Sequence, residues 1–175
     1  MQRVFHSTKL STTPEFLLMR IERMSFDHRE RHGMKNDLPF LFENVIDIKP
    51  MCTELITDQK VLYDLQQVMV HRGTGVSGHY YMHYKIVEEN GRIRWFKAND
   101  HDVNEEREEI LFNEALGGYH EGLSGMVNRN AFLLVYKRIQ VQTEDRTEIE
   151  ESFDRRRAVV MREKRLFLDL RAPFT

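Results

Sequence analysis

A histidine stands directly after a glycine-rich segment in this chain of 175 residues. Gly73, Gly75 and Gly78 precede it, and glycine allows both a backbone bend and the close approach of another backbone. His79 then begins a segment of alternating large residues, which predicts that a rigid strand holds its imidazole. An imidazole takes up and releases protons near neutral pH, so His79 is a candidate general base beside a groove at the bend.

The same glycines spell the pattern G-x-G-x-x-G, which is typical of dinucleotide-binding sites. That site requires a helix after the last glycine, because the helix N-terminus binds the pyrophosphate. Residues 79–87 instead place Tyr80, Met82, Tyr84 and Ile86 at every second position, which is the period of a strand. We therefore reject the nucleotide-binding interpretation.

A second strand is expected to bring a partner to His79. An Asn-Gly pair at residues 90–91 favours a tight hairpin turn, and residues 92–98 return as a strand. Antiparallel pairing around that turn places Asn99 or Asp100 opposite His79, within hydrogen-bonding range. An acceptor on one ring nitrogen fixes the tautomer of a catalytic histidine, and the sequence leaves open which of the two residues supplies it.

Two other candidate sites are weaker. Cys52 is the chain's one cysteine, and the proline and methionine before it and the glutamate after it offer little to activate a thiolate. We predict that Cys52 is a buried structural residue. His28 and His32 have the i, i+4 spacing of a helical metal pair, but their segment is typical of a solvated loop without a third ligand. We predict no metal site.

Hydrophobic periodicity predicts the strands around these residues. Residues 16–24 are expected to form a core strand buried on both faces, and residues 61–71 lead into the glycine bend. Residues 131–138 are strongly apolar and are expected to be central. Residues 38–42 are apolar and contain a proline, which suits an edge strand or an ordered crossing over the core. Residues 25–37 are predicted to form a hairpin-like loop.

Helices are expected to be few. A capping box at residues 102–105 is expected to open a helix over residues 106–116, which glycines at residues 117–118 end. Residues 148–164 carry interspersed charges of both signs and predict an exposed helix. The whole pattern predicts an α+β fold, mostly antiparallel sheet with few helices and a charged C-terminal helix.

Composition excludes several classes of partner. The formal net charge is −2, and charges of both signs are mixed, so we expect neither nucleic acid nor an anionic membrane surface as a partner. No apolar run approaches the roughly 20 residues of a membrane-spanning helix. A single cysteine excludes an internal disulfide framework, and we expect a cytoplasmic or nuclear protein, or one present in both compartments.

The strand, bend and histidine together form a recognisable motif. The pattern Y-x-L-x-x-V-x-V-H-x-G … G-H-Y is matched by Tyr63, Leu65, Val68, Val70, His71, Gly73, Gly78, His79 and Tyr80. The pattern W-[YF]-K-F-[ND]-D follows at Trp95, Phe96, Lys97, Asn99 and Asp100, with Ala98 in place of the usual Phe. Over residues 1–140 the chain resembles the C-terminal half of the catalytic domain of ubiquitin-specific proteases, which are cysteine deubiquitinases. Residues 141–175 would then be a charged helical tail or linker.

The resemblance implies a palm-like half of a papain-like protease and a role for each matched residue. His79 would be the general base, and Asn99 or its neighbour Asp100 would orient its ring. Gly73, Gly75, Gly78 and Tyr80 would contact the C-terminal tail of ubiquitin. Ubiquitin and ubiquitinated proteins would be the partners, and no cofactor is implied.

The chain also departs from the family pattern. The family's nucleophile lies in an N-x-G-x-x-C box, which nothing before Phe16 resembles, and its zinc-binding cysteine pairs are missing. The resemblance therefore implies that the isolated chain is inactive and that a missing N-terminal half of the domain is a possible partner. The alternative is a non-catalytic ubiquitin-binding module or an inactive truncated relative.

Overall fold

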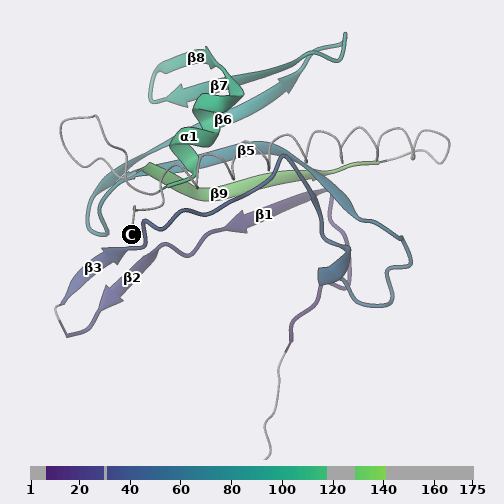
Figure 1. Cartoon of the computed structure of the whole chain (residues 1–175), viewed down its shortest axis with the longest axis horizontal. Helices are drawn as coiled ribbons and strands as arrows, with labels where there is room; N and C mark the ends of the chain where they lie inside the picture. The colour runs from purple at the N-terminus through teal and green to yellow at the C-terminus, as the bar shows by residue number, and fades with distance from the viewer. Residues whose placement is uncertain (1–6, 30, 118–128, 141–175) are drawn as a thin grey trace, which may run out of the picture. The chain divides into compact units, whose positions relative to one another are not determined.

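The computed structural model describes residues 7–29, 31–117 and 129–140 (Figure 1). The chain divides into two compact units, which we describe separately. The first contains Met1–Glu15, Glu43–Asp64 and Arg138–Thr175, and the second contains Phe16–Phe42 and Leu65–Lys137. The helix predicted over residues 148–164 lies outside the described residues.

Most of the second unit is one sheet. Its strand order is β1 (Phe16–Arg20), β9 (Arg129–Arg138), β5 (Leu62–Gly73), β6 (Gly78–Val87), β7 (Ile93–Asn99) and β8 (Asp102–Glu106). The pairs β1 with β9, β5 with β6, β6 with β7 and β7 with β8 are all antiparallel. With one α-helix among the described residues, α1 (Glu108–Ala115), the fold is α+β and mostly antiparallel, as predicted.

Two hairpins fix the register around the predicted base. The first pairs Arg72 with His79 across the glycine bend. The second turns at Gly91, whose φ of 80° lies in the left-handed region that glycine adopts without strain. It pairs Met82 with Ala98. The predicted hairpin is therefore confirmed, and it returns the end of β7 to the start of β6.

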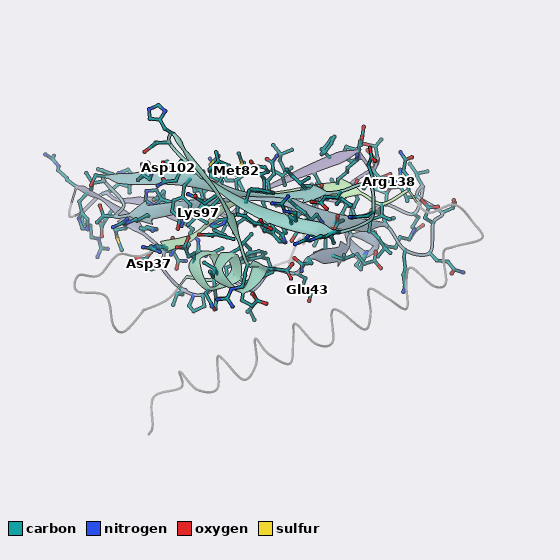
Figure 2. All side chains as sticks on the ribbon, turned by 90° about the horizontal axis from the view of Figure 1, so that it is seen from above. Asp37, Glu43, Met82, Lys97, Asp102 and Arg138 are labelled. Carbon is teal, nitrogen blue, oxygen red and sulfur yellow. The ribbon has the colours of Figure 1, made fainter. Side chains whose placement is uncertain are left out.

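Helix α1 packs against one face of the sheet (Figure 2). Leu111 and Ala115 of the helix are fully buried, as are Val68 and Val70 of β5. Trp95 of β7 is also buried. Burying such apolar side chains contributes roughly 1.5–3 kcal/mol for each large one, so this contact holds the helix over β6 and β7.

A small hairpin, β2 (Met24–Asp27) with β3 (His32–Lys35), forms in the segment predicted to be a hairpin-like loop. Arg23, just before β2, donates from Nε to the carbonyl of Ala131 and from Nη1 to the carbonyls of Asn36 and Leu38. This buried guanidinium ties the hairpin to β9.

Residues 38–42 form no strand, which leaves the ordered crossing of the two alternatives predicted for them. Two local expectations were wrong. Phe16 is 48% exposed and Leu18 62% exposed, because β1 is an edge strand and not a core strand. The segment predicted as a capping box belongs to β8, because its pairing with β7 supplies more hydrogen bonds than a local cap. Arg107 precedes α1 without a side-chain cap.

The first unit is smaller. Strand β4 (Val45–Asp47) pairs antiparallel with the first residues of β5, and a 3₁₀ helix, η1 (Lys49–Met51), follows. Cys52 is buried and its thiol donates to the carbonyl of Ile48, which confirms the structural role predicted for it. Arg138 forms an ion pair with Asp58 in the same unit. Among the described residues no helix has both the length and the apolar character needed to span a membrane.

Candidate active site

The hairpin of β6 and β7 brings His79 and Asn99 into contact. The Nε2 atom of His79 lies 2.6 Å from the Oδ1 atom of Asn99. An amide oxygen only accepts hydrogen bonds, so this contact requires the proton of a neutral His79 ring to be on Nε2. The Nδ1 atom is then the free acceptor of the ring. The geometric prediction from the turn is confirmed.

Asp100 is the more distant of the two predicted partners. Its Oδ2 atom lies 3.6 Å from His79 Nε2, and its side chain is 70% exposed. Its backbone has a φ of 53°, a left-handed conformation that Asp tolerates better than most residues. Asn99 is therefore the closer of the two acceptors, and Asp100 adds a nearby negative charge. The side chain of His79 is 43% exposed, so a reactant can reach it.

The glycines of the bend are required by contacts within the chain. Gly73 has a φ of 140°, and Thr74 and Ser77 close the turn through a hydrogen bond from the Thr74 amide to the Ser77 carbonyl. A side chain at Gly75 would lie 2.5 Å from the backbone of Gly33 in β3. The bend thus packs backbone to backbone against the small hairpin.

Gly78 and Tyr80 pack around a buried histidine. A side chain at Gly78 would overlap the imidazole of His71, which is buried. The ring centroid of Tyr80 lies 4.7 Å from the ring centroid of His71 and 5.2 Å from that of Phe132, yet Tyr80 is half exposed. Its exposed part, like the side chain of Val76 in the bend, remains available to a ligand.

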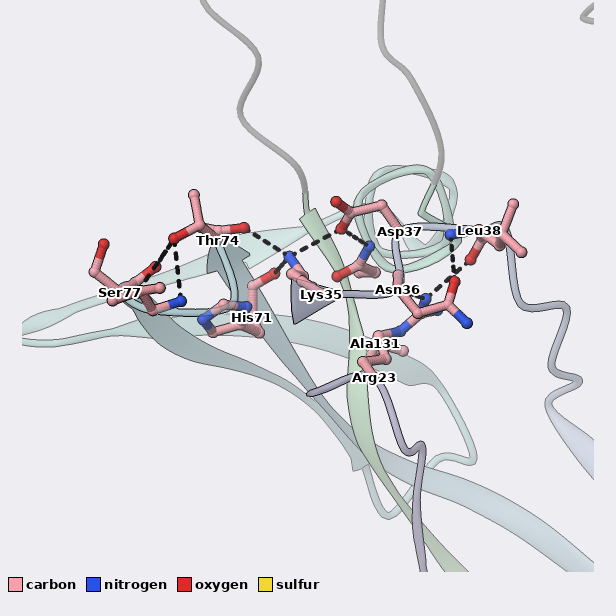
Figure 3. Close-up of polar contacts among 12 residues, drawn as sticks. Arg23, Lys35, Asn36, Asp37, Leu38, His71, Thr74, Ser77 and Ala131 are labelled. Carbon is pink, nitrogen blue, oxygen red and sulfur yellow. Dashed lines mark hydrogen bonds and ion pairs between the residues drawn. The ribbon is translucent and has the colours of Figure 1, made fainter. Parts of the chain in front are cut away.

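A buried lysine fixes the end of β5 (Figure 3). The ammonium of Lys35 donates to the carbonyls of His71 and Gly73, at 3.3 and 3.1 Å. It also lies 3.3 Å from Asp37 Oδ1, which accepts a hydrogen bond from Asn130. Burial lowers the pKa of Lys35, and the Asp37 carboxylate opposes that shift. Sequence reasoning missed this role, since nothing local connects Lys35 to carbonyls 36 and 38 residues away.

Three potential metal ligands lie together on the α1 side of the sheet, namely His83, Glu106 and Glu114. His83 Nδ1 lies 3.3 Å from Glu106 and Nε2 lies 3.4 Å from Glu114. The two ring nitrogens thus face different carboxylates, whereas one metal ion would be bound by a single nitrogen. Lys97 and Arg129 already balance the two negative charges, so these contacts fit an ion-pair cluster better than a metal site.

Comparison with known proteins identifies the family. Residues 5–136 match the family model described as ubiquitin carboxyl-terminal hydrolase, which covers more than half of the chain. The chain belongs to the ubiquitin carboxyl-terminal hydrolase family. The resemblance to ubiquitin-specific proteases inferred from the histidine motif is thereby confirmed.

Several relatives carry the hydrolase name. The chain is 27% identical over 161 residues to the rat ubiquitin carboxyl-terminal hydrolase 48, covering 85% of this chain and 15% of that protein. It is 27% identical over 175 residues to mouse hydrolase 9Y, covering 75% of this chain and 7% of that protein. It is 33% identical over 100 residues to human ubiquitin carboxyl-terminal hydrolase 40, covering 56% of this chain and 8% of that protein. The chain therefore spans only a small part of these hydrolases.

Solved structures share the fold. A yeast SAGA DUB module with an Sgf73 mutant matches with a TM-score of 0.58 and 25% identity, covering 77% of this chain and 25% of that chain. A SAGA DUB module bound to monoubiquitin matches with a TM-score of 0.56 and 24% identity, again covering 77% of this chain and 25% of that chain. The chain thus shares the fold of the matched part of these modules.

The close approach at Gly75 gives a first test of the site. We expect Gly75→Ala to lower the free energy of unfolding by about 1–3 kcal/mol, because the added methyl group must displace the backbone of Gly33. Urea unfolding measures this, and hydrogen exchange locates it at the small hairpin. The matched control is Ser77→Ala in the same bend, which adds no atoms and is expected to change stability by less than about 0.5 kcal/mol. Equal effects of the two substitutions would contradict the packing described.

Proposed function

We propose that this chain supplies the general base and the tail-binding bend of a thiol-dependent deubiquitinase, which hydrolyses the bond after the C-terminal glycine of ubiquitin. The observation that carries the proposal is the contact of 2.6 Å between His79 and Asn99 on a hydrolase-family sheet. A fixed tautomer with its acceptor nitrogen free is what a thiol protease requires of its histidine.

Each residue has a defined step. His79 Nδ1 takes the proton of an attacking thiol, and the thiolate adds to the carbonyl carbon of the terminal glycine. Nδ1–H of the resulting imidazolium then protonates the departing amine, which leaves an acyl-enzyme. The ring next takes a proton from water, and the hydroxide adds to the acyl carbon. The C–S bond then breaks, the imidazolium returns the proton to the leaving thiolate, and ubiquitin is released with a free C-terminal carboxyl group. Asn99 keeps the ring oriented throughout, and the Asp100 carboxylate lies 3.6 Å from Nε2.

Binding of the ubiquitin tail is assigned to the bend and to Tyr80. The tail is thin and extended, so backbone groups and one flat side chain suffice to hold it. Support comes from the exposed ring of Tyr80 beside the bend, and from a neighbour of the same fold whose title describes it as bound to monoubiquitin. Gly73, Gly75 and Gly78 shape this surface through the internal contacts described above.

The attacking thiol is proposed to come from outside this chain. Cys52 is buried and its thiol is bonded to the Ile48 carbonyl, which is the opposite of an exposed thiolate. The same observation favours a second candidate function, a ubiquitin-binding module without catalysis. The two candidates differ in what the chain does when a cysteine-bearing segment is present.

Ubiquitin binding tests both candidates. We expect the chain to bind ubiquitin in a calorimetric titration, and removal of the last two glycines of ubiquitin to weaken binding at least tenfold, because they are the residues placed in the bend. We expect no hydrolysis of a ubiquitin C-terminal fluorogenic amide. Equal binding of intact and shortened ubiquitin would overturn the assignment of the bend, and turnover abolished by Cys52→Ser would overturn the assignment of the thiol.

The catalytic candidate makes the sharper claim. In a longer form of the protein that hydrolyses the fluorogenic amide, His79→Ala is expected to lower kcat/KM by about 10²–10⁴ without changing the Kd for ubiquitin. If His79→Ala binds ubiquitin and its kcat/KM equals that of the unmodified longer form, His79 is not the general base. Ubiquitin binding would then be the function that remains for this part of the protein.

A further inference from the structure

One carboxylate of α1 receives donors from three strands. Glu114 accepts a hydrogen bond of 2.8 Å from the Tyr81 hydroxyl of β6 and one of 2.8 Å from the Lys97 ammonium of β7. Arg129 of β9 bonds its other oxygen. His83 of β6 lies 3.4 Å away. No local sequence signal distinguishes Glu114 from the other glutamates of the helix.

Two of these donors are neighbours of the candidate catalytic pair. Tyr81 lies two residues after His79 on β6, and Lys97 lies two residues before Asn99 on β7. Side chains two apart on a strand point to the same face, so all four lie on the face that α1 covers. The rings of His79 and Tyr81 are stacked with their centroids 6.5 Å apart, and the Lys97 ammonium lies 4.5 Å from the Tyr81 ring.

The charges make this arrangement rigid. Burial alone would raise the pKa of Glu114, but the contacts with His83, Lys97 and Tyr81 outweigh it and hold the pKa at about 2. Burial and the same carboxylate raise the pKa of Tyr81, which therefore remains a neutral donor. Only 13% of the Glu114 side chain is exposed, so water cannot replace the carboxylate as the partner of these groups.

We propose that Glu114 is a positioning residue for His79 and Asn99, acting through Tyr81 and Lys97 to set the spacing of β6 and β7 at the site. As a catalytic assignment this rests on the proposed function. Without the carboxylate, Glu106 is the remaining counterion of this cluster within the described residues, and its oxygen lies 3.7 Å from Lys97. Tyr81 of β6 and Lys97 of β7 then lose the acceptor that they share, and the contact between His79 and Asn99 on the same two strands lengthens.

The tautomer of His79 reports this directly. Nitrogen NMR of the imidazole distinguishes a ring protonated on Nε2 from one protonated on Nδ1, and the chain needs no activity for the measurement. We expect the Nε2–H form to dominate in the unmodified chain. Glu114→Gln is expected to reduce the ratio of the two tautomers several-fold, because the hydrogen bond from Nε2 to Asn99 is weakened.

Matched variants separate this from general damage. Asn99→Ala removes the acceptor of the His79 hydrogen bond, so the change that it causes in the tautomer ratio is the largest expected. Glu109→Gln removes a charge from an exposed position of the same helix and is expected to leave the tautomer ratio unchanged. Tyr81→Phe removes one hydroxyl group and keeps the ring, so it is expected to shift the ratio in the same direction as Glu114→Gln, by a smaller factor.

The inference is overturned if the tautomer ratio of Glu114→Gln equals that of the unmodified chain while Asn99→Ala changes it. If Glu114→Gln does not fold, Tyr81→Phe decides, and an unchanged ratio overturns the inference. Failure of the proposed function has a different signature, since loss of ubiquitin binding leaves the tautomer of His79 as it is.

Discussion

Lys35→Met is expected to lower the free energy of unfolding by about 3 kcal/mol, because it removes the buried donor that joins two backbone carbonyls to Asp37. Methionine keeps most of the volume of the side chain, so the loss is mainly electrostatic. Only 2% of the Lys35 side chain is exposed, and water cannot reach the carbonyls of His71 and Gly73 in its place. Urea unfolding followed by the fluorescence of Trp95, the only tryptophan, measures the change.

The control for this prediction is Lys137→Met. Lys137 is exposed on β9, where its ammonium lies 5.6 Å from the ring of Phe16. Exposed charge contacts of this kind contribute little, so we expect a change of less than about 1 kcal/mol. If the two methionine variants are equally stable, the buried ammonium does not hold the end of β5 as the structure indicates.

The contact between His79 and Asn99 could be predicted from the sequence because one local signal fixes it. The Asn-Gly turn at residues 90–91 sets the register of a hairpin, and a two-residue period then determines which side chains share a face. Nothing distant is needed. The same reasoning identified β6 and β7 and excluded the nucleotide-binding helix after Gly78.

Contacts made across long stretches of sequence could not be predicted in this way. Lys35 and Glu114 are ordinary charged residues in their own segments, and their roles arise only when β3 packs on the bend and α1 packs on the sheet. The edge position of β1 has the same cause, since an apolar segment reads as core until its neighbours are known. The capping box failed because strand pairing with β7 competes with a helix cap for the same residues.

Acid is expected to destabilise the second unit through Glu114. Its pKa is about 2 in the folded chain, against an ordinary value of 4.5, so the folded state binds its proton later than the unfolded state does. The stabilisation is complete above about pH 4.5 and is lost as the pH falls toward 2, with a total of about 3 kcal/mol. Urea unfolding at a series of pH values, again followed by Trp95, measures it, and Glu114→Gln is expected to flatten the curve in that window.

Glu105→Gln serves as the control for the acid prediction, since Glu105 is a carboxylate of the same sheet with a very different environment. Hydrogen bonds from Arg94 lower the pKa of Glu105 as well, but the pair lies on the surface, where salt screens it. We therefore expect Glu105→Gln to leave the acid transition nearly unchanged in high salt, whereas the effect of Glu114→Gln persists there. Parallel stability curves for Glu114→Gln and the unmodified chain would mean that the carboxylate is not the buried hub of β6, β7 and β9. The role inferred for it beside His79 would lose its physical basis.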